Sequence, residues 1–156
     1  MTIDLALYQP DIAQNTGTLV RLGACLGFTV HIIHPAGFPV SAKTLARSGL
    51  DYLDHALIVE HASFERFEAW RQEAGRRLVL LTTKASRSAY AEAYREGDML
   101  MVGRESAGVP DAVAARADLR VRIPMRPGLR SINVALSAAM VMGEAMRQVD
   151  GWTALA

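Results

Sequence analysis

Three segments of the chain place polar or charged side chains next to glycine or proline. The first reads NTGTLVR (15–21) and sets Arg21 six residues after Asn15. The second reads GRESAG (103–108), with Glu105 between two glycines, and the third reads IPMRPGLRSIN (123–133). Arginine can bind phosphate through two parallel hydrogen bonds, and glycine lets a ligand approach the backbone closely. These residue types indicate a candidate site for a ligand that carries phosphate.

The third segment belongs to the most basic part of the chain. Five arginines face a single acid, Asp118, between residues 116 and 130: Arg116, Arg120, Arg122, Arg126 and Arg130. Such a cluster is typical of phosphate binding. Ser131 and Asn133 follow where the last helix is expected to begin, and helix N-termini favour anions. Helix capping explains Ser131 by itself, but it does not explain the arginines gathered around it.

The other two segments also have purely structural explanations. Asn15 can cap a helix on which Arg21 is a solvated side chain. Glu105 can be a solvated loop acid, the ion-pair partner of an arginine, or a ligand contact. The residues alone leave these alternatives open.

Several common site types are absent from the sequence. No G-x-G-x-x-G follows the first apolar run, and Val-Pro follows GRESAG where a phosphate-binding loop needs Lys-Ser or Lys-Thr. Cys25 is the only cysteine, which excludes an intrachain disulfide, and we expect it to lie in the core. The four histidines lack the spacing of metal ligands, so no metal is expected: they are His31, His34, His55 and His61.

Short apolar runs alternate with helical stretches from end to end. The runs at 3–8, 29–33, 56–59, 77–82, 98–102 and 119–124 predict six strands. This alternation is typical of an α/β domain with a mostly parallel sheet flanked by helices. Ligands of such sheets bind beyond the carboxyl ends of the strands. The polar segments follow predicted strands, so we expect them to meet at that edge.

The last helix is expected to run from about Ser131 to Val149. It carries Met140, Met142 and Met146 with alanine and glycine between them, and it is nearly uncharged. Small residues permit close helix packing, and methionine fills irregular gaps. The helix is therefore expected to be buried, either in its own core or against a second subunit.

Length and composition fit one domain spanning residues 1–156. Hydrophobic residues make up 51% of the chain, charged residues 21%, and the net charge is +1. That charge excludes a protein that coats nucleic acid non-specifically, though not a local basic face. The N-terminus lacks the basic region of a signal peptide, and no apolar run approaches the ~20 residues that span a bilayer. We expect a cytoplasmic protein without membrane contact.

Taken together, the segments resemble the SPOUT superfamily of RNA methyltransferases. Within it they resemble the small tRNA wobble-base ribose 2′-O-methyltransferases, the TrmL group. The resemblance runs from LALYQPDIAQNTGTLVRLGACLGFTVHIIHPAGF through RSGLDY, LTTK, VGRESAGVP and IPMRPGLRSINVALS. Each motif is loose, but their joint order, spacing and whole-chain coverage are specific.

This resemblance implies a fold, a cofactor and a partner. The C-terminal segment would thread through a loop to form a deep trefoil knot, although unknotted chains are the strong default. The knot loops would bind S-adenosyl-L-methionine, which leaves as S-adenosyl-L-homocysteine, and no metal is required. The enzyme would be a homodimer whose last helix supplies much of the interface.

The resemblance also implies roles for particular residues. Those that match donor-lining positions are Leu81, Gly103, Ile123 and Ser131. Arg21 matches the proposed general base for the ribose 2′-hydroxyl, although an arginine at its ordinary pKa is a poor base and needs help or acts on phosphate. Asn15, Glu105 and Asn133 match positions that orient the hydroxyl or a neighbouring phosphate, and Ser131 would serve both donor and substrate.

The implied substrate is the wobble nucleotide, cytidine or modified uridine at position 34, in the anticodon region of leucine-type tRNAs. The chain lacks the terminal extensions of larger relatives, so RNA contacts would come from the dimer surface, including Lys43, Arg47 and the arginines of 116–130. Two alternatives stay open: a ribose methyltransferase of ribosomal RNA, and a knotted dimer that binds RNA or a nucleotide without catalysis.

Two departures from the family pattern bear on the RNA substrate. Relatives often read P-E-T-R-G where this chain reads RESAG, so Arg104 precedes Glu105 and Ala107 replaces the usual arginine. The S-x-N pattern is kept at Ser131 to Asn133, but the asparagine usual a few residues later is Leu136 or Ser137.

Overall fold

A computed structural model describes residues 2–156, except for the side chains of 46–52. Within this range six strands form one sheet in the order β3-β2-β1-β5-β4-β6, and every strand pair in it is parallel. The strands are β1 (Asp4–Tyr8), β2 (Val30–Ile33), β3 (Ile58–His61), β4 (Leu78–Leu81), β5 (Met99–Val102) and β6 (Leu119–Val121). The predicted six-stranded α/β sheet is confirmed. Five strands are shorter than their apolar runs, and β3 lies two residues later than the run at 56–59.

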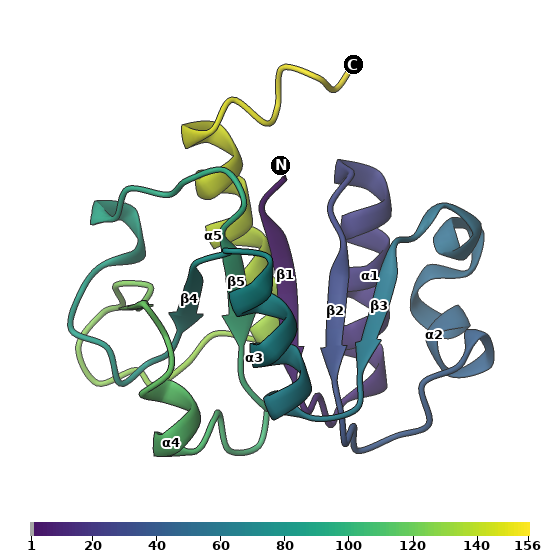
Figure 1. Ribbon diagram of the computed structural model, residues 1–156, viewed down its shortest axis with the longest axis horizontal. Coiled ribbons are helices and arrows are strands. Elements are labelled where there is room, and N and C mark those ends of the chain that lie inside the picture. Colours follow the sequence, from purple (N-terminus) through teal and green to yellow (C-terminus); the bar gives the residue numbers. More distant parts are fainter. Residues whose placement is uncertain (1) are drawn as a thin grey trace.

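Helices cover both faces of the sheet (Figure 1). They are α1 (Ala13–Leu26), α2 (Ala42–Gly49), α3 (Phe64–Glu73), α4 (Asp111–Ala114) and α5 (Val134–Gln148), with 3-10 turns at Leu50–His55 and Ala89–Ala91. α1, α2 and α5 pack on one face, and α3 and α4 on the other. The strands point downward in Figure 1, and both termini lie at the top, away from the carboxyl edge.

The four inner strands, β2, β1, β5 and β4, are buried on both faces, as their continuous apolar runs predict for a covered parallel sheet, whereas the edge strands β3 and β6 are partly exposed. In β1, Leu5 and Leu7 belong to the core under α1 and α5, whereas Ala6 and Tyr8 belong to the core under α3. Burying one large apolar side chain stabilises the fold by roughly 1.5–3 kcal/mol. An inner strand such as β1 therefore packs against both helical layers, and this packing fixes the position of its carboxyl end.

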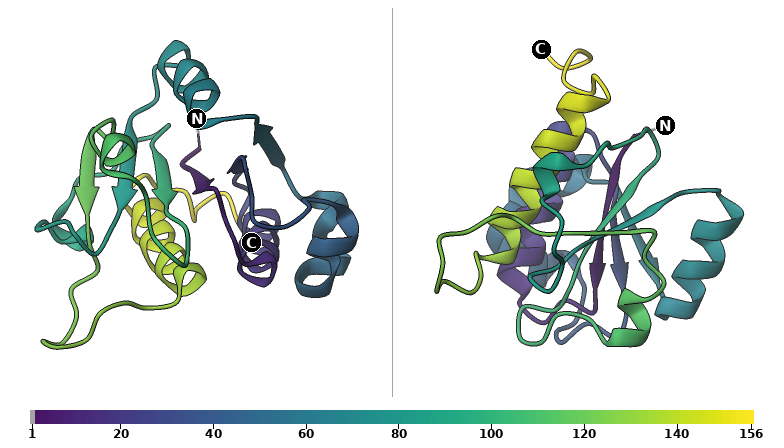
Figure 2. Two further views of the ribbon diagram at one scale, coloured as in Figure 1. Left: turned by 90° about the horizontal axis from the view of Figure 1, so that it is seen from below. Right: turned by 90° about the vertical axis from the view of Figure 1, so that its left-hand side faces the viewer.

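The chain after β6 runs against the connection between β4 and β5. The Arg122 N–H donates to the Arg87 carbonyl (2.9 Å), and the Arg122 carbonyl accepts from the Ala89 N–H (2.7 Å). The segment then crosses to the other face and enters α5, beside α1 (Figure 2). Two stretches from different parts of the chain are thus fixed to one another beyond the end of β6.

The start of α5 corrects a prediction. The helix begins at Val134, and its cap is Asn133, whose Oδ1 accepts from the N–H groups of Ala135 (2.8 Å) and Leu136 (3.2 Å). The expected Ser131 cap and helix start are wrong because the chain stays irregular through Ile132. Asn15 is likewise no cap, since α1 begins two residues before it, at Ala13.

α5 is buried on one side only. Its core residues are Ala135, Ala138, Val141, Met142, Ala145 and Met146, whereas Leu136 and Met140 are exposed. Its own core therefore covers only part of the helix, and the expected burial against a second subunit stays a prediction. Cys25 is exposed as well, so its expected place in the core is wrong. Among the described residues, no helix combines the length and hydropathy needed to cross a bilayer.

Two pairs of buried polar side chains, Arg76 with Asp4 and His31 with His61, lie between the sheet and α3. Arg76 donates to Asp4 (2.8 Å) and to two backbone carbonyls, which ties the start of β4 to β1. Nearby, His31 Nδ1 lies 2.9 Å from His61 Nε2, and the rings stack beside Trp70. Burial, and then the nearby His61, lower the pKa of His31 to about 4, so both rings are expected to be neutral at pH 7.

This histidine pair predicts a loss of stability in acid. The folded pKa of His31 lies below its unfolded value of 6.5, so the unfolded chain binds more protons between pH 6.5 and about 4. The stabilisation is therefore complete above pH 6.5 and is lost as pH falls, by about 3 kcal/mol at pH 4. Denaturant unfolding at pH 7, 5.5 and 4 measures this loss. His31→Gln should reduce the slope, and His55→Gln, at an exposed position, should not.

Candidate functional site

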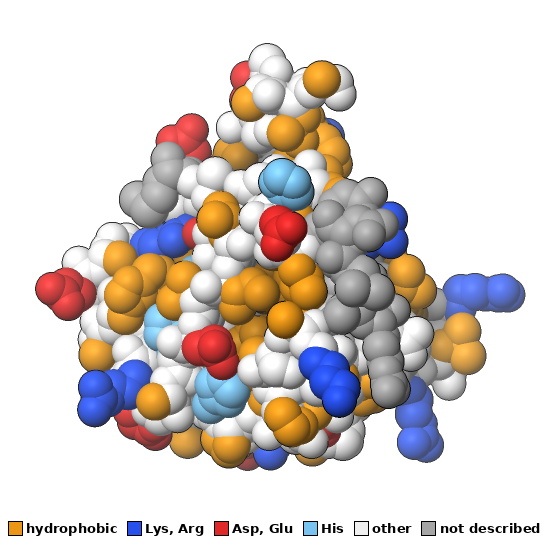
Figure 3. Space-filling view, turned by 90° about the vertical axis from the view of Figure 1, so that its right-hand side faces the viewer, with side chains coloured by type: hydrophobic (Ala, Val, Ile, Leu, Met, Phe, Trp, Pro, Cys, Tyr) orange, Lys and Arg blue, Asp and Glu red, His pale blue; other side chains and the backbone are white. Residues whose placement is uncertain are grey.

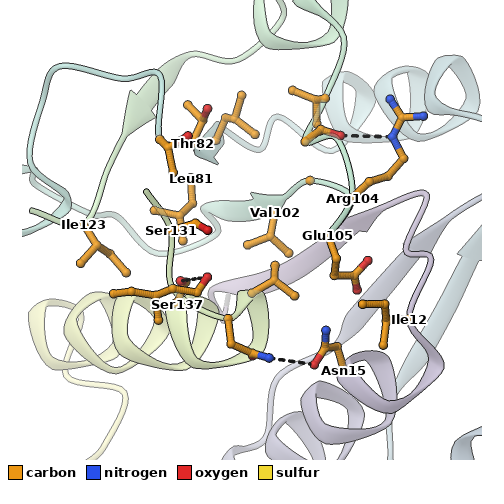
Figure 4. Close-up of a pocket in the computed structure, with 18 of the residues that line it drawn as sticks. Ile12, Asn15, Leu81, Thr82, Val102, Arg104, Glu105, Ile123, Ser131 and Ser137 are labelled. Carbon is orange, nitrogen blue, oxygen red and sulfur yellow. Dashed lines mark hydrogen bonds between the residues drawn. The ribbon is translucent and has the colours of Figure 1, made fainter. Parts of the chain in front are cut away.

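A cavity of about 360 Å³ opens at the carboxyl edge of the sheet (Figure 4). It lies beyond the ends of β4, β5 and β6 and beside the start of α1. All three polar segments contribute to its wall, as expected for ligands of parallel sheets. The predicted site residues that line it are Asn15, Leu81, Gly103, Glu105, Ile123, Ser131 and Asn133. Of the described site candidates, Arg21 alone lies outside this lining.

The cavity has an apolar and a polar side. Leu81 and Ile123 lie toward one end, with Ser131 and Ser137 near them, and Val102 forms the middle of the wall (Figure 4). Glu105, Ile12 and Asn15 lie at the other end. A ligand with a flat apolar ring and a polar sugar would match this division, because pockets of this size commonly pair apolar walls with a few polar groups.

Gly103 is required by the turn that follows β5. The N–H of Arg104 donates to the Gly108 carbonyl (3.1 Å), and the N–H of Gly108 donates back to the Arg104 carbonyl (2.8 Å). A Cβ on Gly103 would lie 2.7 Å from the Gly108 Cα, closer than packed atoms allow. Gly108 itself has a φ of +63°, in the left-handed region that favours glycine. The two glycines therefore shape this wall of the cavity.

Asn133 links the two helices at the site. While its Oδ1 caps α5, its Nδ2 donates to Asn15 Oδ1 (3.3 Å), the bond drawn at Asn15 in Figure 4. The two amides belong to segments more than a hundred residues apart. The structure thus places two predicted site residues in direct contact, and it gives Asn133 the capping role expected of Ser131.

The loop before α1 fixes the side chain of Glu105 through a hydrogen bond. Its Oε2 accepts from the N–H of Asp11 (3.0 Å), and the Asp11 carboxylate in turn accepts from the hydroxyl of Ser106. Burial, and then the Asp11 side chain, raise the pKa of Glu105. Asp11 was missed by reasoning from the sequence. The available signal was an acid directly after Pro10 at the end of a buried strand.

Arg104 lines the cavity, whereas Arg21 and the arginines of 116–130 lie outside its lining. Arg21 is exposed on α1, two turns from Asn15. Arg104 donates from Nε to the Gly108 carbonyl (3.2 Å) and places its guanidinium 5.6 Å from the centre of the Tyr8 ring. Arg116 pairs with Glu68 (3.3 Å), so one member of the basic cluster already has an acidic partner.

The other four arginines of the cluster, Arg120, Arg122, Arg126 and Arg130, are exposed. Lys43 is exposed too, while the side chain of Arg47 lies outside the described residues. Over α2 and the edge strand β3, Lys and Arg side chains stand apart from one another among hydrophobic and acidic ones (Figure 3). The basic segment before α5 is therefore the better candidate for a phosphate contact than that face.

The model of the SpoU rRNA Methylase family matches residues 2–143. A tRNA (cytidine(34)-2′-O)-methyltransferase of Beijerinckia indica subsp. indica is 61% identical over 145 residues, which cover 93% of this chain and 91% of that relative. A solved structure from work on the 2-OH methylation of C/U34 on tRNA has a TM-score of 0.90 at 39% identity and covers 96% of this chain and 97% of its own.

A further solved structure carries a bound ligand. The SpoU methyltransferase AviRb from Streptomyces viridochromogenes, in complex with the cofactor AdoMet, has a TM-score of 0.85 at 25% identity, over 94% of this chain and 60% of its own. These matches imply the C-terminal trefoil knot, formed where the segment after β6 meets the β4–β5 connection. By family model, sequence identity and fold, the chain belongs to the SpoU rRNA methylase family.

Proposed function

We propose that the chain is an S-adenosyl-L-methionine-dependent tRNA methyltransferase. It would methylate the ribose 2′-hydroxyl of the wobble nucleotide, cytidine or modified uridine at position 34 of leucine-type tRNAs. The observation that carries this proposal is the meeting of all three motif segments around one cavity. The 61% identical relative, a tRNA (cytidine(34)-2′-O)-methyltransferase, supports position 34.

The residues of the apolar side fit the donor. Leu81, Gly103, Ile123 and Ser131 all line the cavity, and the absence of a side chain at Gly103 lets the turn close against Gly108. S-adenosyl-L-methionine would supply an electrophilic methyl group on a positively charged sulfur. The protein's contribution is to hold the hydroxyl oxygen in line with that methyl, since orientation alone can supply much of the rate.

The polar side would receive the ribose. Asn15 and Asn133 fix one another, and Glu105 is fixed by Asp11, so these groups are already ordered for a hydroxyl or phosphate. As the oxygen–methyl bond forms and the sulfur–methyl bond breaks, the hydroxyl proton must pass to a base. We assign this proton to Arg21, which would have to meet the hydroxyl as a neutral guanidine and would become a guanidinium held by a substrate phosphate. The exposed arginines before α5 and Lys43 would hold the RNA backbone, and a tRNA substrate implies a cytoplasmic enzyme.

The exposed part of α5 favours a homodimer. Leu136 is 61% and Met140 43% exposed, one helical turn apart on the same side of the helix, and α1 lies alongside. Large apolar side chains gathered on one helix face are typical of an interface. A second subunit that packs here would cover them and would bring its own α1 close to the RNA.

Ribosomal RNA is the second candidate substrate, because the matching family model is that of an rRNA methylase. A binding protein without catalysis is the third possibility. Purified protein with methyl-labelled donor, offered tRNA and ribosomal RNA separately, distinguishes them. Label in tRNA supports the proposal, label only in ribosomal RNA contradicts the tRNA assignment, and no label in either favours the binding protein.

Arg21→Ala tests the proposed base. We expect the rate of tRNA methylation to fall by at least about a hundredfold, the usual contribution of an acid–base group, with little change in donor affinity by calorimetry. Arg66→Ala, on the opposite face of the sheet, is the matched control and should keep the wild-type rate. Normal methylation by Arg21→Ala would remove Arg21 from the chemistry.

Gly103→Ala tests the donor wall. The added methyl would overlap the Gly108 backbone, so the turn must open and donor affinity should fall by more than about tenfold, or ~1.4 kcal/mol. Titration calorimetry with S-adenosyl-L-methionine measures this. Gly151→Ala is the control, because Gly151 is not part of the cavity lining and a Cβ there would make an ordinary contact with Met146, at 3.4 Å. Equal donor affinity in both variants would contradict this location of the donor.

Leu136→Glu tests the dimer. A buried charge without a partner is costly, so we expect the variant to sediment as a monomer at concentrations where the wild type is a dimer. Leu57→Glu, at a 56% exposed leucine beside the edge strand β3, should leave the dimer intact. Sedimentation velocity decides between them, and a dimeric Leu136→Glu variant would exclude this face of α5 from the interface.

A further inference from the structure

Asp11 stands where the loops after three strands meet. Its N–H donates to Glu105 Oε2 (3.0 Å) in the loop after β5, and its Oδ2 accepts from the Ser106 hydroxyl of the same loop. The loop after β2 packs closely against Asp11 at Gly37, since a Cβ on Gly37 would lie only 2.9 Å from the Asp11 Cβ. Asp11 therefore holds the Glu105 loop against the start of α1, at the cavity wall.

The second oxygen of Asp11 is unsatisfied. Asp11 Oδ1 is buried and has no hydrogen-bond donor among the described residues. A buried carboxylate oxygen without a donor is costly, and native structures rarely leave one. One side chain that could supply a proton is the carboxyl group of Glu105, which accepts from the Asp11 N–H and interacts with the Asp11 carboxyl group.

Two adjacent carboxyl groups resist being ionised together. Glu105 is the more buried of the two: burial and then Asp11 raise the pKa of Glu105, whereas Glu105 and then Ser106 lower the pKa of Asp11. Both directions favour one negative charge on Asp11 and one proton on Glu105. That proton, donated to Asp11, would satisfy the buried oxygen.

Other charged groups lie on the elements around the pair. On the same loop, Arg104 is turned to the Gly108 carbonyl and the Tyr8 ring. On the loop after β2, His34 pairs with Glu60 (2.8 Å). Arg21 lies farther along α1, and Arg126 and Arg130 lie on the segment before α5. Arg104 and His34 thus have partners elsewhere, and the side chains of Asp11 and Glu105 form hydrogen bonds with groups of the Asp11–Glu105–Ser106 cluster itself.

We propose that Asp11 is a positioning residue for methyl transfer, which retains one proton in a shared Asp11–Glu105 carboxyl pair and so presents Glu105 to the RNA as a neutral acid. The inference rests on the proposed function for its role, but the shared proton can be tested without it. A neutral Glu105 does not repel the phosphates beside the target ribose. Loss of the proton at higher pH places a second negative charge at the wall and weakens tRNA binding.

Asp11→Asn is the decisive variant. The asparagine keeps an oxygen for the Ser106 hydroxyl but offers an N–H to Glu105, which stabilises the ionised form of Glu105. We expect the KM for tRNA to rise with pH in the wild type, and to rise at lower pH in Asp11→Asn, reaching about tenfold above wild type near neutral pH. The KM for the donor should change little. In Glu105→Gln the pH dependence of the tRNA KM should disappear.

Ser106→Ala is the matched control. It removes the other partner of Asp11 but keeps both carboxyl groups, so the tRNA KM should still rise with pH, at the same pH as in the wild type or higher, and not at the lower pH expected of Asp11→Asn. If Ser106→Ala reproduces the Asp11→Asn profile, loosening of the loop explains the effect and the shared proton is rejected. An Asp11→Asn profile identical to that of the wild type rejects it too.

Carbon-13 NMR of the side-chain carboxyl groups tests the proton directly, with neither RNA nor donor. We expect one glutamate signal of the wild type to titrate above the ordinary glutamate range, to titrate lower in Asp11→Asn, and to be absent in Glu105→Gln. If no such signal exists, the proposal is wrong whatever the enzyme methylates. If it exists but the wild type labels no tRNA, the shared proton stands and the proposed function fails.

Discussion

The pairing of β1 with β5 is the contact on which the site depends. These strands are far apart in the sequence, yet they lie side by side in parallel, with Asp4 opposite Met99 and Leu7 opposite Val102. Their shared direction brings the loop that contains Asp11 against the loop that contains Glu105. Without this pairing neither the Asp11–Glu105 contact nor the cavity beside it would form, because each loop supplies only half of the polar wall. Burial of β1 on both faces fixes the pairing, since a slip by one residue would reverse the core-facing side chains of the strand.

The part of the cavity wall formed by residues 123–133 depends on a second constraint, the course of the chain after β6. Arg122 is fixed to the β4–β5 connection by backbone hydrogen bonds, and only beyond it does the chain turn back to α5. Asn133 then ends the irregular stretch, caps the helix and reaches Asn15 on α1. The Asn133 side chain thus joins the start of α5 to Asn15 of α1, on the opposite side of the cavity. The same helix buries one side in the core and leaves Leu136 and Met140 exposed, so the cavity wall before α5 and the proposed interface are consecutive parts of one segment.

Much of the fold could be predicted from the sequence because apolar runs such as LVLL and MLMV are typical of strands buried on both faces. The convergence of the three motifs followed from the rule that ligands bind at the carboxyl edge. The knot could not be predicted this way, since hydrophobic periodicity does not record which loop a chain passes through, and only the family resemblance implied it. Ser131 was the expected cap, but the chain stays irregular through Ile132, so that Asn133 caps α5 instead. Cys25 lies on a helix with an apolar pattern but faces outward. Asp11 was missed because its role depends on a partner ninety-four residues away, and the distance of Arg21 from the cavity depends on where α1 begins.

We propose that the protein methylates the ribose at position 34 of tRNA and that the reaction takes place in this cavity. The most direct test of this proposal is nuclease mapping of 2′-O-methylation in leucine tRNAs from a strain that lacks the gene, with and without the gene restored. We expect the methyl group at nucleotide 34 to be missing in the deletion strain and to return with the wild-type gene. The 2′-O-methylation elsewhere in the tRNA should be unchanged. A deletion strain whose leucine tRNAs keep full methylation at nucleotide 34 would contradict the proposal.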